Sequence, residues 1–435
     1  MRCRAGSGRL EGCRHCPYRR RVPITEAPLV TSLANGVRLL CVPLPGRESV
    51  DVSVFVRAGS RDEPDALAGL SHVVEHMAFK GTATRDCQRI NLDAERLGAE
   101  VNAHTDKDHT AYHMRGLRAD ADKLLRMLAD IVLHGTFPEA ELERERQVIL
   151  QELQEDEDDP LSTAFKLFDQ HCFGSHPMAR PVIGHRASIE RVTRADVQHY
   201  VQQRYSGANM IVGVAGDVDA QALLRVVEDS FGALPAGTAN VAAPAPYLGG
   251  LGARRHAGSS QAHLVLGFPI PTLAEPHAAA QVAAAAFGEG MSSPLMDEVR
   301  ERRGLAYYAN CSADVFDIAG QFVIEASTAP EHVDEFFATV TQLLLQRAER
   351  VDAVELERAR NQIIVRRILA AERPARRLED AALDLFALGR VRSAQERREQ
   401  ISQVDAEQAR AAFARLLAAP PALALAGRLR SGALQ

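Results

Sequence analysis

The segment His72-Val73-Val74-Glu75-His76 constrains this chain more than any other part of it. At about 100° of rotation per residue, the two imidazoles and the carboxylate lie on one face of an α-helix. The other positions between Leu67 and Phe79 are mainly apolar, so the helix is predicted to be buried, and Gly81 is predicted to end it. Burying two imidazoles and a carboxylate is costly unless a partner satisfies them, which a divalent metal ion does. The alternative is a pair of core histidines hydrogen-bonded to neighbours, which is the commoner fate of a single buried histidine.

A zinc site needs at least one further protein ligand, and two glutamates are candidates for it. A second helix is predicted to begin near Pro138, and it carries Glu145 and Glu152 on one face, two turns apart. The residue pattern alone does not choose between these two side chains. A solvent-facing position is also a common fate for any single glutamate on a charged helix.

The motif, followed after 75 intervening residues by Glu152, resembles the pitrilysin family of inverted-motif zinc peptidases. Within that family, the resemblance is to the short-chain branch, which includes mitochondrial processing peptidase and its bacterial relatives. The similar segments cover nearly the whole chain: Gly69–Thr82, Gly98–Tyr112, Pro181–Gly184, Asn209–Asp217 and Ser292–Tyr307. The resemblance implies one Zn²⁺ per chain, with His72, His76 and Glu152 as its ligands and Glu75 as the general base. It makes Glu145 a carboxylate that orients a metal-bound imidazole.

A second pair of polar residues follows from the same resemblance. Arg300 lies in a helix predicted at Leu295–Arg303, Gly304 ends that helix, and Tyr307 lies in the strand predicted to follow. In the family, an arginine and a tyrosine at this interval bind substrate carbonyls and steady the tetrahedral intermediate. An oxyanion forming on a scissile carbonyl needs fixed donors of this kind.

Asn102 and Ala103 begin a segment that is expected to form a sheet edge beside the metal. An extended peptide can add to such an edge as another strand, held by main-chain hydrogen bonds. The same segment carries His104, His109 and His113. Their spacing fits neither one strand face nor one helix face, so we interpret them as polar edge residues and not as a second metal site.

Length and composition limit the possible classes of protein. A chain of 435 residues suits two domains, and a net charge of −6 gives no support to nucleic-acid binding. No apolar stretch has the length of a membrane span. The seven cysteines are scattered and odd in number, which indicates a reducing compartment rather than a disulfide framework. We therefore expect a cytoplasmic bacterial protein, with periplasmic and mitochondrial locations as alternatives.

The order of elements favours the α+β class, with two related α/β-sandwich domains facing each other across a cleft. We expect a disordered leader at residues 1–25, a metal-binding peptidase domain at 26–234, a linker at 235–257 and a substrate-binding domain at 258–435. The linker prediction depends on its Ala, Pro and Gly content. Both halves open with strands that are followed by helices, which suggests an ancient duplication.

The expected activity is zinc-dependent endoproteolysis of unfolded or extended peptides. The alternative is a non-catalytic or partner-dependent subunit, since the family contains partners that keep the fold and lose the metal residues. The resemblance also implies that the chain works as a homodimer or as a heterodimer with a related subunit.

Overall fold

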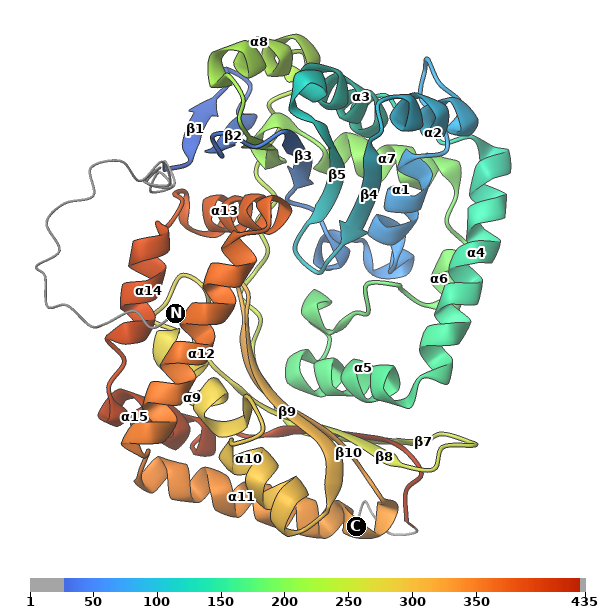
Figure 1. The fold of residues 1–435 in the computed structure, drawn as a ribbon. Coiled ribbons are helices and arrows are strands. Elements are labelled where there is room, and N and C mark those ends of the chain that lie inside the picture. The colour runs from blue at the N-terminus through green and yellow to red at the C-terminus, as the bar shows by residue number, and fades with distance from the viewer. Residues whose placement is uncertain (1–26, 431–435) are drawn as a thin grey trace, which may run out of the picture.

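The computed structural model describes residues 27–430, and the predicted leader at residues 1–25 lies outside the described residues. The described chain forms two sheets with helices packed on both (Figure 1). The first sheet contains β1 (Leu29–Ser32), β2 (Arg38–Pro43), β3 (Ser49–Val56), β4 (Glu100–Thr105), β5 (Thr110–Leu117) and β6 (Met210–Gly216). The second sheet contains β7 (Gly250–Arg255), β8 (Ala262–Pro269), β9 (Ala306–Val315), β10 (Gly320–Thr328) and β11 (Ala422–Gly427).

The two sheets share one topology, which supports the suggested duplication. The first runs in the order β1-β2-β6-β3-β5-β4 and the second in the order β7-β11-β8-β10-β9. In each, the first and the last strand of a five-strand unit pair in parallel, β2 with β6 and β7 with β11, and the other pairs are antiparallel. By this correspondence β4 and β9 are equivalent edge strands.

Helices cover one face of each sheet and build its main core. The first core includes side chains from α1 (Leu70–Ala78), α2 (Cys87–Arg96), α3 (Ala121–Leu133), α4 (Glu139–Asp158), α6 (Arg186–Ile189), α7 (Arg194–Arg204) and α8 (Ala220–Phe231). The second core includes side chains from α9 (Ala278–Gly288), α10 (Pro294–Met296), α11 (Val333–Glu349), α12 (Ala353–Ala371), α14 (Ala394–Ser402) and α15 (Ala406–Leu417). β3 is buried along nearly its whole length, because both faces of the sheet are covered.

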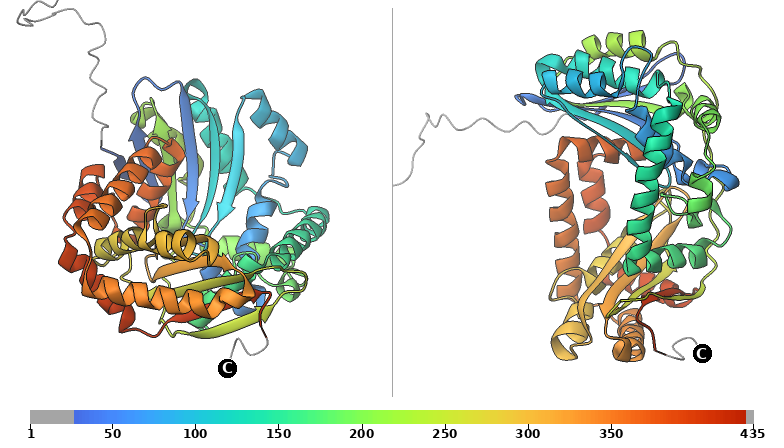
Figure 2. Two further views of the ribbon diagram at one scale, coloured as in Figure 1. Left: turned by 60° about the horizontal axis from the view of Figure 1, so that its bottom comes forward. Right: turned by 90° about the vertical axis from the view of Figure 1, so that its right-hand side faces the viewer.

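The remaining face of each sheet is covered by a helix from the other half. α5 (Pro160–Phe173) packs Phe168 and Phe173 against the second sheet, and α13 (Pro374–Leu388) packs Leu378 and Leu385 against the first. The long helix α4 leads from the first half to α5, and the long helix α12 leads from the second half to α13 (Figures 1 and 2). The halves therefore interlock through exchanged helices.

The predicted fold class is confirmed, and three local predictions need correction. α1 ends at Ala78, three residues before Gly81. The extended segment from residue 101 to 114 is a hairpin of β4 and β5. The predicted linker contains β7, whose backbone partners lie on β11, about 170 residues later, so local composition could not reveal this strand. No helix between residues 27 and 430 is long and apolar enough to cross a membrane.

Candidate metal centre

α1 is fixed at its start by a buried carboxylate. Glu63 accepts hydrogen bonds from the backbone N–H groups of Gly69 and Ser71, each at 2.7 Å. Gly69 has a φ of 95°, and a Cβ there would meet the carbonyl oxygen of Ile183 at 2.8 Å, so only glycine fits. Burial raises the pKa of Glu63 to about 8, although the two N–H donors and Arg180 oppose the rise. These contacts set where the metal-binding turn of α1 begins.

Three ligand atoms converge where α1 meets α4. Nε2 of His76 lies 3.2 Å from Nε2 of His72, and Oε2 of Glu152 lies 3.6 Å from the His76 nitrogen and 3.7 Å from the His72 nitrogen. Ligands of a tetrahedral zinc ion with bonds of about 2.0–2.2 Å are themselves about 3.3–3.5 Å apart. The donor set of two imidazoles and one carboxylate therefore fits a zinc ion in both chemistry and spacing. The predicted choice of Glu152 over Glu145 agrees with this arrangement.

The His72 imidazole is held in the form that binds a metal. Burial, together with the charge of His76, lowers the pKa of His72 to about 4, so this ring is neutral at neutral pH. Only a neutral imidazole offers a lone pair to a metal ion. Nδ1 of His72 is buried and has no hydrogen-bond partner among the described residues, whereas Nδ1 of His76 has one.

The partner of His76 is Glu145. Its Oε2 lies 3.0 Å from Nδ1 of His76, and its Oε1 lies 2.7 Å from Nζ of Lys80. Burial opposes ionisation of Glu145, but the hydrogen bonds from Lys80 and His76 outweigh it and lower the pKa. Glu145 thus lies behind the His76 ring, and its support of a metal ligand stays a prediction. Lys80, which follows the end of α1, has no role in the sequence interpretation.

Glu75, on α1 with the two histidines, contacts the edge of the first sheet. Oγ1 of Thr105, the last residue of β4, donates a hydrogen bond of 2.6 Å to Oε2 of Glu75. β4 is an edge strand, as predicted for the segment that begins at Asn102 and Ala103. No role for Thr105 could be read from the sequence, because its contact with Glu75 depends on how the sheet packs against α1.

Arg300 and Tyr307 are paired with each other and not with the metal cluster. The Arg300 guanidinium lies 4.6 Å from the centre of the Tyr307 ring, which is 78 % exposed. Arg300 sits in a π-helical turn (Asp297–Arg302), a distortion that is frequent at functional sites. No hydrogen bond or ion pair within residues 27–430 joins this pair to His72, Glu75, His76 or Glu152.

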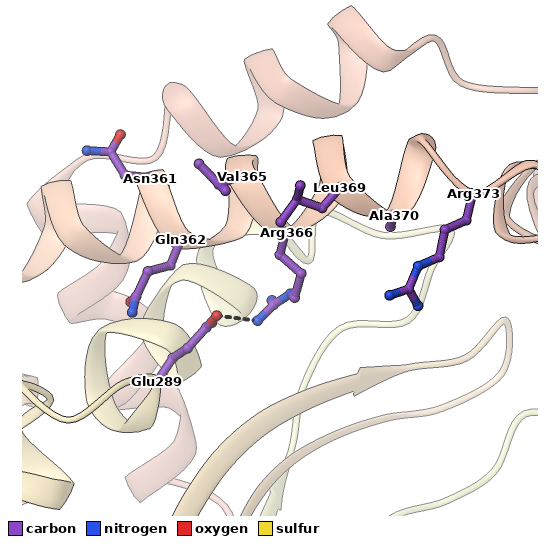
Figure 3. Close-up of a pocket in the computed structure, with 8 residues that line it drawn as sticks. All are labelled: Glu289, Asn361, Gln362, Val365, Arg366, Leu369, Ala370 and Arg373. Atoms are coloured by element: carbon purple, nitrogen blue, oxygen red, sulfur yellow. Dashed lines mark ion pairs between the residues drawn. The ribbon is translucent and has the colours of Figure 1, made fainter.

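The second half has a pocket where the first half has the metal cluster. It lies along α12 beside the end of α9, which is the topological counterpart of the contact between α1 and α4 (Figure 3). Its volume is about 580 Å³ and its lining contains no histidine. An ion pair of 2.5 Å between Glu289 and Arg366 occupies this region. The ligand set of the first half is therefore not repeated here.

Taken together, a metal cluster on one half of a duplicated fold defines a class of two-domain metallopeptidase, and comparison with known proteins identifies the family. The family model described as "Insulinase (Peptidase family M16)" matches residues 39–186, and the model described as "Peptidase M16 inactive domain" matches residues 191–363. The chain belongs to peptidase family M16, which confirms the predicted pitrilysin resemblance.

Relatives over nearly the full length bear the name zinc protease. An "Uncharacterized zinc protease" of Rickettsia felis is 31% identical over 381 residues, covering 87% of this chain and 92% of the relative. A zinc protease of Mycobacterium tuberculosis is 33% identical over 398 residues, covering 90% and 91%. These similarities support a metallopeptidase that uses zinc.

Solved structures share the fold. A peptidase M16 inactive domain from Pseudomonas fluorescens superposes with a TM-score of 0.85 at 23% identity, covering 93% of this chain and 99% of that one. A protease from Helicobacter pylori gives a TM-score of 0.84 at 22% identity, covering 92% and 99%.

Proposed function

We propose that this protein is a zinc-dependent endopeptidase that hydrolyses unfolded or extended peptides. The convergence of His72, His76 and Glu152, at a helix that also carries Glu75, is the observation that carries the proposal. The family assignment supports a zinc protease, and the complete set of ligands argues against a subunit that has lost its metal. One Zn²⁺ per chain is proposed at this centre.

His72, His76 and Glu152 would hold the zinc ion. When bound there, zinc acts as a Lewis acid on a water molecule and on the scissile carbonyl group. Glu75 is proposed to accept the proton of the attacking water and to deliver it to the leaving amine. Thr105 binds Oε2 of Glu75 and leaves Oε1 available for that proton.

The peptide is proposed to bind as an additional strand on β4, beside Asn102 and Ala103. Main-chain hydrogen bonds to an edge strand demand an extended peptide and place few demands on its sequence. Arg300 and Tyr307 are proposed to reach the substrate carbonyls when the two halves move closer together. In the structure, the half-buried Arg300 guanidinium stacks on the exposed Tyr307 ring.

Replacement of Glu75 by Gln tests the proposal with the metal site intact. We expect the variant to bind as much zinc as the wild type and to lose cleavage of an unstructured peptide library by about 10²–10⁴-fold, the usual contribution of a general base. Glu95→Gln, an exposed position on α2, is the matched control and should keep full activity. Turnover by zinc-loaded Glu75→Gln at the wild-type rate would contradict the proposal.

The same assay separates the proposed activity from its alternatives. Mass spectrometry of the products should show cuts inside the peptides, and removal of zinc by a chelator should stop them reversibly. A non-catalytic or partner-dependent subunit would leave the library uncut at every chain concentration. A homodimeric enzyme would gain specific activity as the chain concentration rises, and one that needs a related subunit would gain it only on mixing.

The location proposed for this enzyme is the bacterial cytoplasm. Cys41, Cys87, Cys172 and Cys311 are free thiols in the structure, which suits a reducing compartment.

A further inference from the structure

A second cluster of possible metal ligands joins the two halves of the molecule. It consists of His104 near the end of β4, His109 in the turn before β5, and Glu379 on α13. The interpretation of these histidines as polar edge residues is wrong for His109, which is only 2 % exposed. A hairpin turn brings the two rings together, and the exchanged helix supplies the carboxylate.

The geometry of this cluster resembles that of the first centre. Oε1 of Glu379 lies 3.4 Å from Nε2 of His104 and 3.8 Å from Nε2 of His109. All three ligand atoms lie within 4.8 Å of one another. The two rings are 5.4 Å apart between centroids and nearly perpendicular at 87°, compared with 4.6 Å and 77° for His72 and His76.

In each of the three residues, the nitrogen or oxygen atom that does not face the cluster already has a side-chain partner. Nδ1 of His109 lies 2.6 Å from Oδ1 of Asp108, and Nδ1 of His104 lies 2.9 Å from Nε2 of His113. Oε2 of Glu379 accepts a hydrogen bond of 3.0 Å from Arg376. With both Nδ1 atoms as donors, each Nε2 keeps its lone pair. A carboxylate behind a ligating histidine is also the usual support of a metal ligand.

His109 has an unsatisfied atom that points into the cluster. Its Nε2 is buried and lacks a hydrogen-bond partner among residues 27–430. The 3.8 Å to Oε1 of Glu379 is too long for a hydrogen bond, although two ligands of one metal ion can be this far apart. An orphaned polar atom at this depth is costly, and a bound cation would satisfy it.

We propose that His104, His109 and Glu379 bind a second divalent transition-metal ion, with Zn²⁺ as the matching species for two nitrogens and one oxygen. This ion ties α13 of the second half to the β4–β5 hairpin of the first. Neighbouring residues of a strand face opposite sides of the sheet, so His104 lies on the far side of β4 from Thr105, which contacts Glu75. The second ion thus steadies the edge strand of the proposed peptidase site. Binding of this second ion does not depend on peptidase activity.

Metal content after saturation with Zn²⁺ and gel filtration tests this site. The wild type should retain two equivalents of zinc. His76→Asn, which removes a ligand of the first centre, should retain one, and so should Glu379→Gln. The double variant should retain none, while Glu372→Gln, an exposed residue shortly before α13, should retain two like the wild type.

Two further measurements keep the test decisive. Co²⁺ bound to His76→Asn should give the visible absorption of a four-coordinate site, and Glu379→Gln in that background should abolish it. If Glu379→Gln does not fold, His104→Ala serves instead, because the His104 side chain is 38 % exposed and its loss leaves no buried cavity. One equivalent in the wild type, or two equivalents in folded Glu379→Gln or His104→Ala, would overturn the proposal.

Discussion

At the scale of single residues, the candidate metal centre depends on which atom of each side chain is engaged in a hydrogen bond and which atom is left to face the metal position. Glu145 fixes Nδ1 of His76 and so directs Nε2 of that ring toward Nε2 of His72 and Oε2 of Glu152. Lys80 in turn holds the other oxygen of Glu145. The two carboxylates of α4 therefore have different tasks, although the sequence pattern presents them on the same face of the helix.

Glu145→Gln should weaken zinc binding without removing a ligand. An amide can still bond to His76 but no longer carries the charge that raises the basicity of its imidazole, so zinc affinity should fall by about 10–100-fold. Competition with a chromophoric chelator measures this change. Glu143→Gln, on the exposed face of the same helix, should bind zinc like the wild type. Equal affinities for Glu145→Gln and Glu143→Gln would show that Glu145 does not support His76.

His72, Glu75 and His76 could be identified from the sequence because the spacing within a helix determines which side chains share a face. His72, Glu75 and His76 needed only that regularity, and the family resemblance then chose Glu152. Thr105, Lys80 and Glu379 escaped notice because their contacts join separate elements. The same limit explains His109, whose burial follows from a hairpin turn and from a helix that lies 270 residues further along the chain.

At the scale of elements, α1 depends on the buried carboxylate that precedes it. Glu63 replaces a side-chain cap by accepting the N–H groups of Gly69 and Ser71, and these contacts position the turn that carries His72. A buried acid in this place makes the stability of the helix sensitive to pH. The sequence offers no such signal, because Glu63 lies among other acidic residues, six positions before Gly69, in a segment without helical or strand periodicity.

Glu63 should make the metal-free protein less stable as the pH rises from about 4.5 to 8. The pKa of Glu63 is raised from 4.5 to about 8 by burial, so the folded state holds its proton over a range in which the unfolded state has lost it. The stabilisation is complete below pH 4.5 and is lost as the pH rises to 8. The loss is on the order of a few kcal/mol, at about 1.4 kcal/mol per pKa unit.

Urea unfolding at pH 5.5 and pH 8, with a chelator present, measures this effect. In Glu63→Gln the residue no longer titrates, so the free energy of unfolding should fall less between the two pH values than it does in the wild type. Glu48→Gln, whose side chain is 81 % exposed, should keep the wild-type difference. A wild-type difference that persists in Glu63→Gln would assign the pH dependence to other groups.

At the scale of the whole molecule, the exchanged helices make each half depend on the other. α13 covers the first sheet, α5 covers the second, and Arg61 joins the halves through an ion pair with Asp317 at 2.9 Å. The Arg61 and Asp317 side chains are only 1 % and 11 % exposed. The predicted α+β class and its duplication could be read from the order of strands and helices. The exchange could not, because α5 and α13 have ordinary helical sequences that do not specify which sheet they cover.

Leu378→Ala should destabilise both halves together. Leu378 is fully buried against the first sheet, and a Cβ on Gly213 of β6 would lie only 3.1 Å from its Cδ2. The truncation should cost about 2–5 kcal/mol, as for other buried leucines. Calorimetry should show one unfolding transition at a lower temperature, whereas Leu369→Ala, at a position that is 57 % exposed on α12, should change little. Two separated transitions in Leu378→Ala would show that the halves fold independently.

One zinc ion is proposed to bind between α1 and α4 of the first half. Anomalous diffraction at the zinc edge, from crystals of the full chain grown with zinc, locates the ion directly. We expect a peak at about 2.0–2.2 Å from Nε2 of His72, Nε2 of His76 and Oε2 of Glu152. The absence of a peak there in zinc-saturated crystals, or three side chains that point away from one another, would contradict it.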